Sequence, residues 1–398
     1  MKYRILVMIC ALVFSLRSSG RAEGAAAAEP QRLSVRDYDG PLWEERLVKA
    51  VWRYRQLVRE DDGEQLPVSK SLVKPGDRYA GAARLTRFLR LVGDLPAQAA
   101  SDPELYAGPL VKAVKHFQRR HGLAPDGVLG ERTLRQLNIP LDQRLRQLLL
   151  TLERWRWLPH RFSQPPILVN IPEFRLYAGG TPSQKVVVGM AFEHETPVFT
   201  SRMTEVIFRP PWTVPLSIQQ NELVPEIGKD PAYLKEHDFE VIDGMDTVVS
   251  TGGISAAVLA RLRDGNLYLR QRPGPKNSLG LVKFLIGNKH GVYIHGAPSK
   301  SGFWASRRDL SHGCIRVMAP EALAAWVLRD LPAWTPGRIR AAMEGTETLT
   351  VKLPEPVPVL IQYGTAAVEE NGEVRFFDDI YDRDTAEWEA FEERSGAR

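Results

Sequence analysis

The spacing of hydrophobic residues changes about 165 residues into the chain. Before that point, apolar residues recur every three or four positions, which predicts helices over 41–59, 82–92, 109–121, 131–137 and 141–157. Beyond it, short apolar runs bounded by glycine and proline predict strands at 167–172, 174–177, 186–190, 205–208, 281–286 and 291–295. The pattern therefore predicts a helical N-terminal part followed by a mainly β domain.

One stretch interrupts the predicted strands. Residues 216–265 are mixed and more polar, with a predicted helix near 255–263, and we interpret them as an insertion, or cap, within the β domain. Downstream we expect a helix at 320–328 with proline in its first turn, a strand at 358–363, and a hairpin at 366–377 with the type I′ turn signal Asn371-Gly372.

The first residues are typical of a secretory signal peptide. A short basic start is followed by an apolar run at 5–16 and then by small and polar residues. We place the signal at 1–22, with its end open among several alanines; an uncleaved N-terminal anchor is the alternative. The apolar run is shorter than the roughly 20 residues of a membrane span, so we expect export and no membrane span in the mature form.

The charge of the chain changes once the signal is removed. The sequence has 53 basic and 48 acidic residues, a net charge of +5. Residues 1–22 hold four of the basic residues and no acidic one, which leaves a net charge of +1. Binding nucleic acid needs a concentrated basic surface, so we expect no nucleic-acid partner. A hydrophobic content of 43% over 398 residues indicates an ordinary globular protein of two or three domains.

Cysteine is the most informative residue type. Of two cysteines, Cys10 lies in the predicted signal, so the mature chain keeps only Cys314. A single cysteine in an oxidising compartment has no intramolecular partner. It is either a buried apolar residue or a thiol kept for its reactivity.

The neighbours of Cys314 favour reactivity. Cys314 follows Ser311-His312-Gly313, and Tyr293-Ile294-His295-Gly296 lies a short distance upstream. A thiol is a few per cent ionised at neutral pH, and a nearby imidazole can take its proton to form a thiolate–imidazolium pair. Gly313 has no Cβ to block a substrate, and the N–H groups of Gly313 and Cys314 would stabilise an oxyanion.

Other interpretations of these residues stay open. Cys314 can be a plain buried thiol. His295, His312 and Cys314 are together legitimate ligands for zinc. The adjacent His-Gly pair and the distant His295 favour the nucleophile, so we expect neither a metal nor another cofactor.

The third and fourth predicted helices carry spaced motifs. Ala-Val-Lys-His-Phe-Gln-Arg-Arg-His-Gly-Leu at 113–123 is followed by Asp-Gly-Val-Leu-Gly at 126–130, Thr-Leu at 133–134 and Leu-Asn at 137–138. This pattern resembles the three-helix peptidoglycan-binding domain of cell-wall enzymes, which we place at 79–138. The alternative is a generic three-helix module with no ligand of its own.

The cysteine segment resembles a second family. His295, a spacer, Ser-His-Gly-Cys at 311–314 and Arg316 are similar to the signature of YkuD-type L,D-transpeptidases. Similar supporting stretches are 167–172, 196–199, 212–215 and 272–280. The whole chain resembles the large periplasmic subclass, which carries a peptidoglycan-binding domain and a cap insertion. We therefore expect a location in the periplasm or cell envelope.

The resemblance implies a multidomain α+β protein, with an all-α three-helix domain and a mainly β catalytic domain. We expect the following divisions: a signal at 1–22, a linker and N-terminal helix at 23–78, the peptidoglycan-binding domain at 79–138, a connecting helix at 139–165, the catalytic domain at 166–345 with its cap at about 216–270, and C-terminal strands and tail at 346–398.

The resemblance also implies roles for individual residues. Cys314 would be the nucleophile, and His295 the general base and later acid, oriented by the Gly296 carbonyl. His312 and Gly313 would shape the oxyanion site. The expected substrate-binding residues are Arg316, Ser311, Tyr293 and Trp212. The chain departs from the subclass in two places: it has Gly296-Ala297 where Asp-Thr is usual, and Arg209-Pro210-Pro211 where Asn-Pro is usual.

The implied reaction is a cross-linking of peptidoglycan. Cys314 would attack the third-residue carbonyl of a donor tetrapeptide stem and release D-Ala, and the side-chain amine of a diamino acid would then take the acyl group, giving a 3→3 link. A carbapenem would acylate the same thiol. Expected partners are peptidoglycan and other cell-wall synthases. The alternatives are a thiol hydrolase (carboxypeptidase or endopeptidase) on the same scaffold and a non-catalytic wall-binding protein.

Overall fold

The structure is a computed structural model that describes residues 40–67, 72–160, 162, 164–230 and 232–396. The predicted signal at 1–22 and the start of the predicted linker lie outside these residues. The described chain forms two compact units. The helical unit comprises 40–121, 125–153 and 365–396, and the β unit comprises 122–124 and 154–364.

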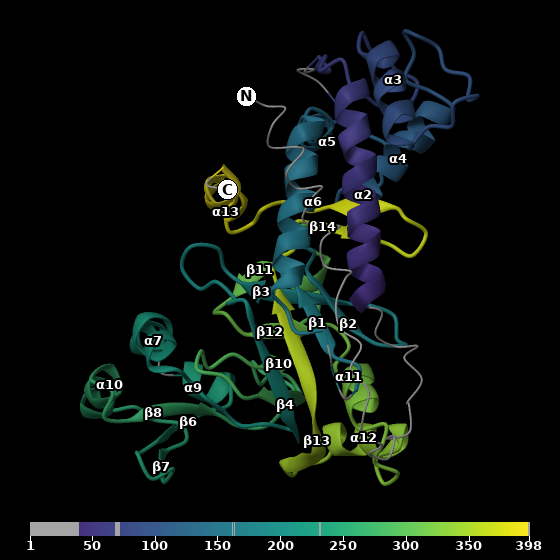
Figure 1. Ribbon diagram of the computed structural model, residues 1–398. Helices are drawn as coiled ribbons and strands as arrows, with labels where there is room; N and C mark the ends of the chain where they lie inside the picture. Colours follow the sequence, from purple (N-terminus) through teal and green to yellow (C-terminus); the bar gives the residue numbers. More distant parts are fainter. Residues whose placement is uncertain (1–39, 68–71, 161, 163, 231, 397–398) are drawn as a thin grey trace, which may run out of the picture. The chain divides into compact units, whose positions relative to one another are not determined.

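Each of the five helices predicted for the N-terminal part is confirmed. They are α2 (Gly40–Glu60), α3 (Ala82–Val92), α4 (Pro109–Arg120), α5 (Glu131–Leu137) and α6 (Leu141–Arg156), shown in Figure 1. Gly93 ends α3 in the left-handed conformation with φ +87°, as helix C-termini favour. The buried Phe88 and Phe117 rings meet edge to face, with centroids 6.3 Å apart, in the core between α3 and α4.

The helical unit also contains the hairpin from the end of the chain. Strands β14 (Ala366–Val368) and β15 (Val374–Phe376) pair antiparallel, as predicted. The prediction of a type I′ turn at Asn371-Gly372 is wrong. That turn needs a positive φ at both central residues, and only Gly372 has one, at +82°. Phe376 is 1% exposed, with its ring centroid 5.3 Å from that of Tyr54 and 5.6 Å from that of His121. The packed helical unit is therefore larger than residues 79–138.

The last helix of the described chain was not predicted from the sequence. Helix α13 (Asp384–Gly396) is mostly polar, and its two aromatic residues, Trp388 and Phe391, stack on each other with centroids 5.4 Å apart. So few apolar positions give only a weak helical periodicity.

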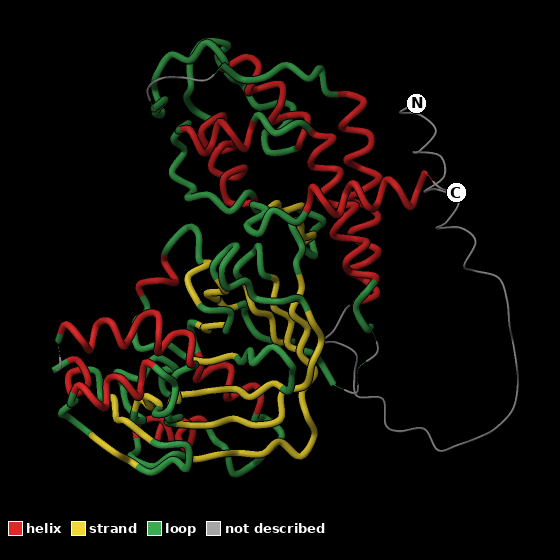
Figure 2. The backbone as a smooth tube through the Cα atoms, turned by 90° about the vertical axis from the view of Figure 1, so that its left-hand side faces the viewer, coloured by secondary structure: helices red, strands yellow, loops and turns green. Residues whose placement is uncertain are grey.

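The β unit is built on a nine-stranded sheet, seen as yellow strands in Figure 2. Its order is β11-β3-β12-β10-β9-β4-β13-β1-β2, and β2 also pairs with β3, so the sheet closes on itself. The strands are β1 (Ile167–Asn170), β2 (Arg175–Ala178), β3 (Gln184–Gly189), β4 (Phe199–Phe208), β9 (Val282–Ile286), β10 (Ile294–His295), β11 (Asp309–Ser311), β12 (Ile315–Val317) and β13 (Leu349–Gln362).

Strand β13 corrects the predicted end of the catalytic domain at 345. It lies between β4 and β1 in the sheet and pairs along most of its length with β4. The predicted segment 346–398 is therefore not one separate piece. Its first part is a central strand of the β unit, and its last part belongs to the helical unit. The physical reason is burial, because Val357, Val359 and Ile361 fill the core of the sheet.

The predicted insertion forms a small subdomain of the β unit. Strands β5 (Trp212–Thr213), β6 (Phe239–Ile242), β7 (Val248–Ser250) and β8 (Tyr268–Gln271) make a second sheet in the order β5-β8-β6-β7. Its helical segments are α7 (Leu216–Ile218), the π-helix η2 (Gln219–Leu223), α8 (Val224–Lys229), α9 (Tyr233–Glu236) and α10 (Ala256–Arg263). These elements share a core of their own, with Val214, Leu234, Val241 and Leu269 at its centre.

Two further helices and one short turn complete the β unit. The predicted helix at 320–328 is confirmed as α11 (Pro320–Val327), whereas α12 (Pro336–Glu344) and the 3-10 helix η3 (Ser301–Trp304) were not predicted. Thr335 caps α12 by accepting a hydrogen bond from the Arg338 N–H. Within the described residues, no helix combines the length and the apolar character needed to span a membrane.

Candidate active site

The pairing of β10 with β12 brings the predicted nucleophile and base to one face of the sheet. The strands run parallel, with His295 opposite Arg316. The Ile315 N–H donates to the Tyr293 carbonyl at 3.0 Å, which extends the pairing to the residue before Ile315. Since successive side chains alternate between faces, Tyr293 and His295 share a face with Cys314 and Arg316. The Tyr293 and His295 rings, with centroids 5.6 Å apart, agree with this register.

The neighbouring strand β9 adds a cation that the sequence analysis did not single out. Lys283 is paired with His295 in the antiparallel register of β9 and β10. Its Nζ lies 4.1 Å from the centre of the Tyr293 ring. The alternation of buried Val282 and Phe284 around Lys283 was the available signal, because it sets Lys283 on the opposite face from the core.

Hydrogen bonds fix the loop that carries Cys314. The Ser311 hydroxyl donates to the Cys314 carbonyl at 2.6 Å, and the fully buried Thr196 hydroxyl donates to the Gly313 carbonyl at 2.8 Å. Thr196 in turn accepts from the Gly189 N–H at 2.8 Å. Ser311 is thus a structural residue of this loop, and binding of substrate by Ser311 stays a prediction.

Gly313 has the backbone conformation that a turn of this kind needs. Its φ of +102° lies in the region that residues with a Cβ rarely adopt. Among the described residues, the N–H groups of Gly313 and Cys314 have no hydrogen-bond partner. The loop therefore leaves two adjacent backbone donors available, and their role in binding an oxyanion stays a prediction.

The protein environment acts on Cys314 in opposite directions. Burial raises the pKa of the Cys314 thiol, whereas Tyr293, Lys283 and Arg316 lower it, and the net shift is upward. The thiol is also within 3.9 Å of the Gly291 carbonyl. The resting site therefore favours the protonated thiol.

His295 is almost fully buried, at 4% exposure. Burial lowers the pKa of His295 to about 3, with a further contribution from the Arg316 charge that the carbonyls of Gly296 and Leu279 oppose. Its Nδ1 atom forms no hydrogen bond of good geometry with any described residue. The orienting role expected for the Gly296 carbonyl stays a prediction.

These two shifts bear on the expected thiolate–imidazolium pair. A raised thiol pKa and a lowered imidazole pKa both favour the neutral pair. The substrate-free site thus favours a protonated thiol and a neutral imidazole over a preformed ion pair, and the role of His295 as base stays a prediction.

His312 and Trp212 both connect the catalytic sheet to the inserted subdomain. The Nε2 atom of His312 lies 2.6 Å from the Glu222 carboxylate, and its ring lies 4.6 Å from that of His194. Trp212 packs against the core of the insertion, and its interaction with the Tyr293 hydroxyl opposes the rise in the pKa of Tyr293 that burial causes. Glu222 carried no signal in the sequence, because the contact joins residues 90 positions apart.

Arg316 contributes charge close to the reactive groups. It is partly buried, and burial lowers the pKa of its guanidinium while Cys314 raises it. Its positive charge lowers the pKa values of both Cys314 and His295. Contact of Arg316 with a substrate carboxylate stays a prediction.

The stretch 272–280 supports the strand that carries His295. Asn277 is fully buried and donates to the carbonyls of Gln271 and Arg272. Gly280 adopts φ +66°, and a Cβ there would lie 2.6 Å from the Ala297 nitrogen. This glycine thus allows the close backbone approach beside Gly296-Ala297.

The described part of the chain contains no cluster of side chains that supports a zinc site. No group of three or more histidine, cysteine, aspartate or glutamate side chains lies close enough there to hold a metal ion. His295 and Cys314 share a sheet face, while His312 is directed to Glu222.

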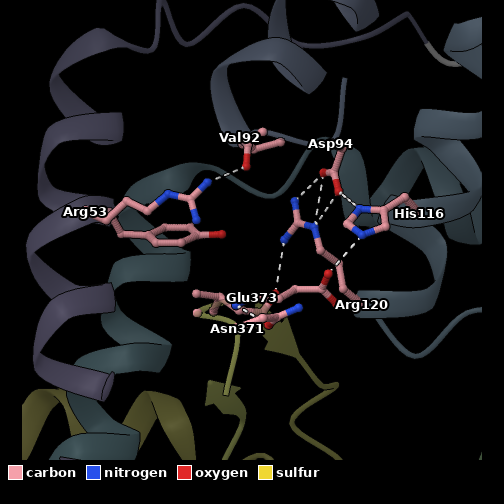
Figure 3. Close-up of a pocket in the computed structure, with 11 residues that line it drawn as sticks. Arg53, Val92, Asp94, His116, Arg120, Asn371 and Glu373 are labelled. Carbon is pink, nitrogen blue, oxygen red and sulfur yellow. Dashed lines mark hydrogen bonds and ion pairs between the residues drawn. The ribbon is translucent and has the colours of Figure 1, made fainter. Parts of the chain in front are cut away.

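The helical unit contains a polar cavity of about 250 Å³ (Figure 3). Arg120 and Asp94 form a buried ion pair at 2.5 Å. His116 bridges Asp94, at 2.6 Å from Nδ1, and Glu373, at 2.9 Å from Nε2. Burial raises the pKa of Asp94, but Arg120 and His116 outweigh it and hold the pKa below the usual range. These charges tie the hairpin to α4, so we assign the cluster a structural role.

Two family models match parts of this chain. Residues 165–359 match the YkuD family, described as the L,D-transpeptidase catalytic domain, and residues 83–137 match a family described as "Putative peptidoglycan binding domain". A Haemophilus influenzae protein named "Putative L,D-transpeptidase" is 31% identical over 223 residues, which are 55% of this chain and 44% of that protein. The match thus spans less than half of that curated relative.

A comparison with solved structures returned a further L,D-transpeptidase. It is the crystal structure of an L,D-transpeptidase from Xylanimonas cellulosilytica. The match covers 74% of this chain and 99% of that chain, with 16% sequence identity and a TM-score of 0.21. The family matches identify the parts of the chain. The β unit contains the residues that match the YkuD family of L,D-transpeptidase catalytic domains, and the helical unit contains most of those that match the peptidoglycan-binding domain.

Proposed function

We propose that this protein is a peptidoglycan L,D-transpeptidase with Cys314 as its nucleophile. The observation that carries the proposal is the parallel register of β10 and β12, which sets His295 and Cys314 on one face of a YkuD-family sheet. The proposed substrate is a peptidoglycan stem tetrapeptide that ends in D-Ala.

The first half-reaction forms a thioester. The Cys314 sulfur attacks the carbonyl carbon of the third stem residue while neutral His295 accepts the thiol proton. The Gly313 and Cys314 N–H groups donate to the resulting oxyanion. The C–N bond to D-Ala then breaks, and His295 returns the proton to the departing amine.

The second half-reaction uses an amine in place of the thiol. The side-chain amine of a diamino acid in another stem attacks the thioester carbonyl, and His295 accepts its proton. Cys314 leaves as the thiol, and the product is a 3→3 cross-link. The neutral state of His295 suits both steps, because only the unprotonated imidazole can act as a base.

The helical unit supports a location on the substrate polymer. We propose that its peptidoglycan-binding domain holds the enzyme on the wall and raises the local concentration of stems. This places the mature protein in the cell envelope, with other cell-wall synthases as proposed partners. Export through residues 1–22 remains part of the proposal.

Covalent labelling tests the nucleophile. The purified wild-type protein is exposed to a carbapenem, whose strained ring a reactive thiol opens, and its intact mass is measured. We expect one added drug mass on the wild type and none on Cys314→Ser, because an alcohol is far harder to deprotonate than a thiol. An unshifted wild-type mass, or an adduct mapped to another residue, would overturn the assignment.

A further inference from the structure

A π-helical segment of the insertion is held rigidly beside the Cys314 loop. Gln219, the first residue of η2, is fully buried. Its amide nitrogen donates to the carbonyls of Leu262 and Leu267 at 2.7 and 3.0 Å, and its amide oxygen accepts from the Leu269 N–H at 2.8 Å. Single π-helical turns occur frequently at functional sites.

The same segment delivers a carboxylate to the active site. Glu222, one turn after Gln219, places Oε1 2.6 Å from His312 Nε2. His312 directly precedes Gly313 and Cys314, whose N–H groups are the proposed oxyanion donors. On another side, His312 meets the His194 ring at 4.6 Å. A hydrogen bond to one ring nitrogen of a histidine fixes both its orientation and its tautomer.

We infer that Glu222 is a positioning residue for the transpeptidase reaction, acting through His312. It holds the ring with its proton on Nε2 and thereby couples the inserted subdomain to the loop that carries Cys314. The inference rests on the proposed function. Its site is specific, because the neighbouring Glu226 of the insertion pairs instead with Lys229 at 2.7 Å.

The exposure of both partners makes the contact suitable for substitution. The Glu222 side chain is 48% exposed and that of His312 is 30% exposed, so removing the carboxylate leaves no buried charge. Glu222→Ala removes the acceptor. Glu222→Gln retains an oxygen at the same place and can still accept from Nε2–H. Glu226→Ala is the matched control on the same subdomain.

The test measures kcat and KM for the cross-linking of soluble muropeptides. We expect Glu222→Ala to lower kcat about 10- to 100-fold with little change in KM, because a misplaced catalytic loop raises the barrier without weakening ground-state binding. Glu222→Gln should stay within about 3-fold of the wild type, and so should Glu226→Ala. A melting curve of each variant confirms that it is folded.

A double variant decides whether Glu222 acts through His312. In a His312→Ala background, adding Glu222→Ala should have no further effect on kcat, because interacting residues are not additive. Wild-type kcat in Glu222→Ala, equal losses in the Ala and Gln variants, a rise in KM alone, or additive losses in the double variant would each overturn the inference. A wild-type protein with no turnover would instead contradict the proposed function itself.

Discussion

Gly280 shows how a missing side chain shapes the neighbourhood of the proposed base. Its φ is +66°, and a Cβ there would lie 2.6 Å from the Ala297 nitrogen and 2.8 Å from the Gly296 carbonyl carbon. Real Cβ atoms do not approach backbone so closely, so Gly280→Ala must displace Gly296 and Ala297. We expect a loss of about 2–5 kcal/mol in the free energy of unfolding, together with reduced turnover.

The matched control for this substitution is Gly63→Ala. Gly63 has a similar φ of +70°, but no atom lies within 4 Å of the added Cβ. Gly63→Ala should therefore lower the free energy of unfolding by only about 1–2 kcal/mol, the cost of a Cβ in the left-handed backbone conformation. Denaturant unfolding of both variants measures the difference. Equal losses would show that the close approach at Gly280 contributes nothing.

His295 makes stability depend on pH in a direction that follows from its burial. Its pKa is about 3 in the folded protein, against 6.5 in the unfolded chain. Between these values the unfolded chain binds more protons, so His295 destabilises the fold as the pH falls below about 6.5. The stability that a neutral His295 allows is fully present above that pH. Replacing it with Asn should flatten this part of the pH profile.

Denaturant unfolding at pH 4.5 and 7.5 checks this prediction. The wild type should lose a few kcal/mol more between the two pH values than His295→Asn does. The control is His290→Asn, which removes an exposed histidine of the same unit. A pH profile of His295→Asn that matches the wild type would contradict a buried, neutral His295.

The residue scale also shows the limits of sequence reasoning. Cys314 and His295 could be singled out because their spacing and neighbours form a recognisable pattern. Their ionisation could not, since the burial of His295 and the charge of Arg316 beside it arise only from the strand register. Glu222 could not be singled out from the sequence, because its contact with His312 depends on how the insertion folds.

Individual elements were predictable where one face is apolar over several turns or residues. The bounds of α3 and α5 agree with the predicted ranges. Strand β13 was predicted only at 358–363, although it runs over Leu349–Gln362. The prolines in the middle of β13 argue against a strand, yet the structure accommodates Pro354 and Pro356 at a shift in register between Lys352 and Val357.

The hairpin β14–β15 contributes a buried aromatic side chain to the core of the helical unit. Phe376 is buried against Tyr54 and His121, and the Arg144 guanidinium lies 4.9 Å from the centre of its ring. Phe376→Ala should therefore destabilise the helical unit by about 3–5 kcal/mol, through lost burial and the cavity it leaves.

Calorimetric thermal unfolding of the whole protein measures this effect, as a lower melting temperature of the helical unit. The control is Trp52→Ala on α2, whose ring is 51% exposed and should contribute less than about 1 kcal/mol. An unchanged melting temperature for Phe376→Ala would mean that the hairpin is not part of the helical unit.

At the scale of the whole molecule, the order of parts along the chain differs from their grouping in space. The sequence predicts a helical part followed by a β part, and both exist. It does not reveal that residues 365–396 return to the helical unit, because this grouping depends on contacts such as Arg120 with Val374 and Gln147 with Phe377. Such long-range contacts leave no periodic signal in the sequence.

The central claim is that the protein joins stem peptides through Cys314. Mass spectrometry of the products from purified protein and disaccharide tetrapeptide tests it most directly. We expect free D-Ala and a dimer that lacks one D-Ala, with a 3→3 link in its fragment spectrum, from the wild type but not from Cys314→Ser. Release of D-Ala with only monomeric tripeptide would identify a hydrolase instead, and an unchanged tetrapeptide would contradict catalysis altogether.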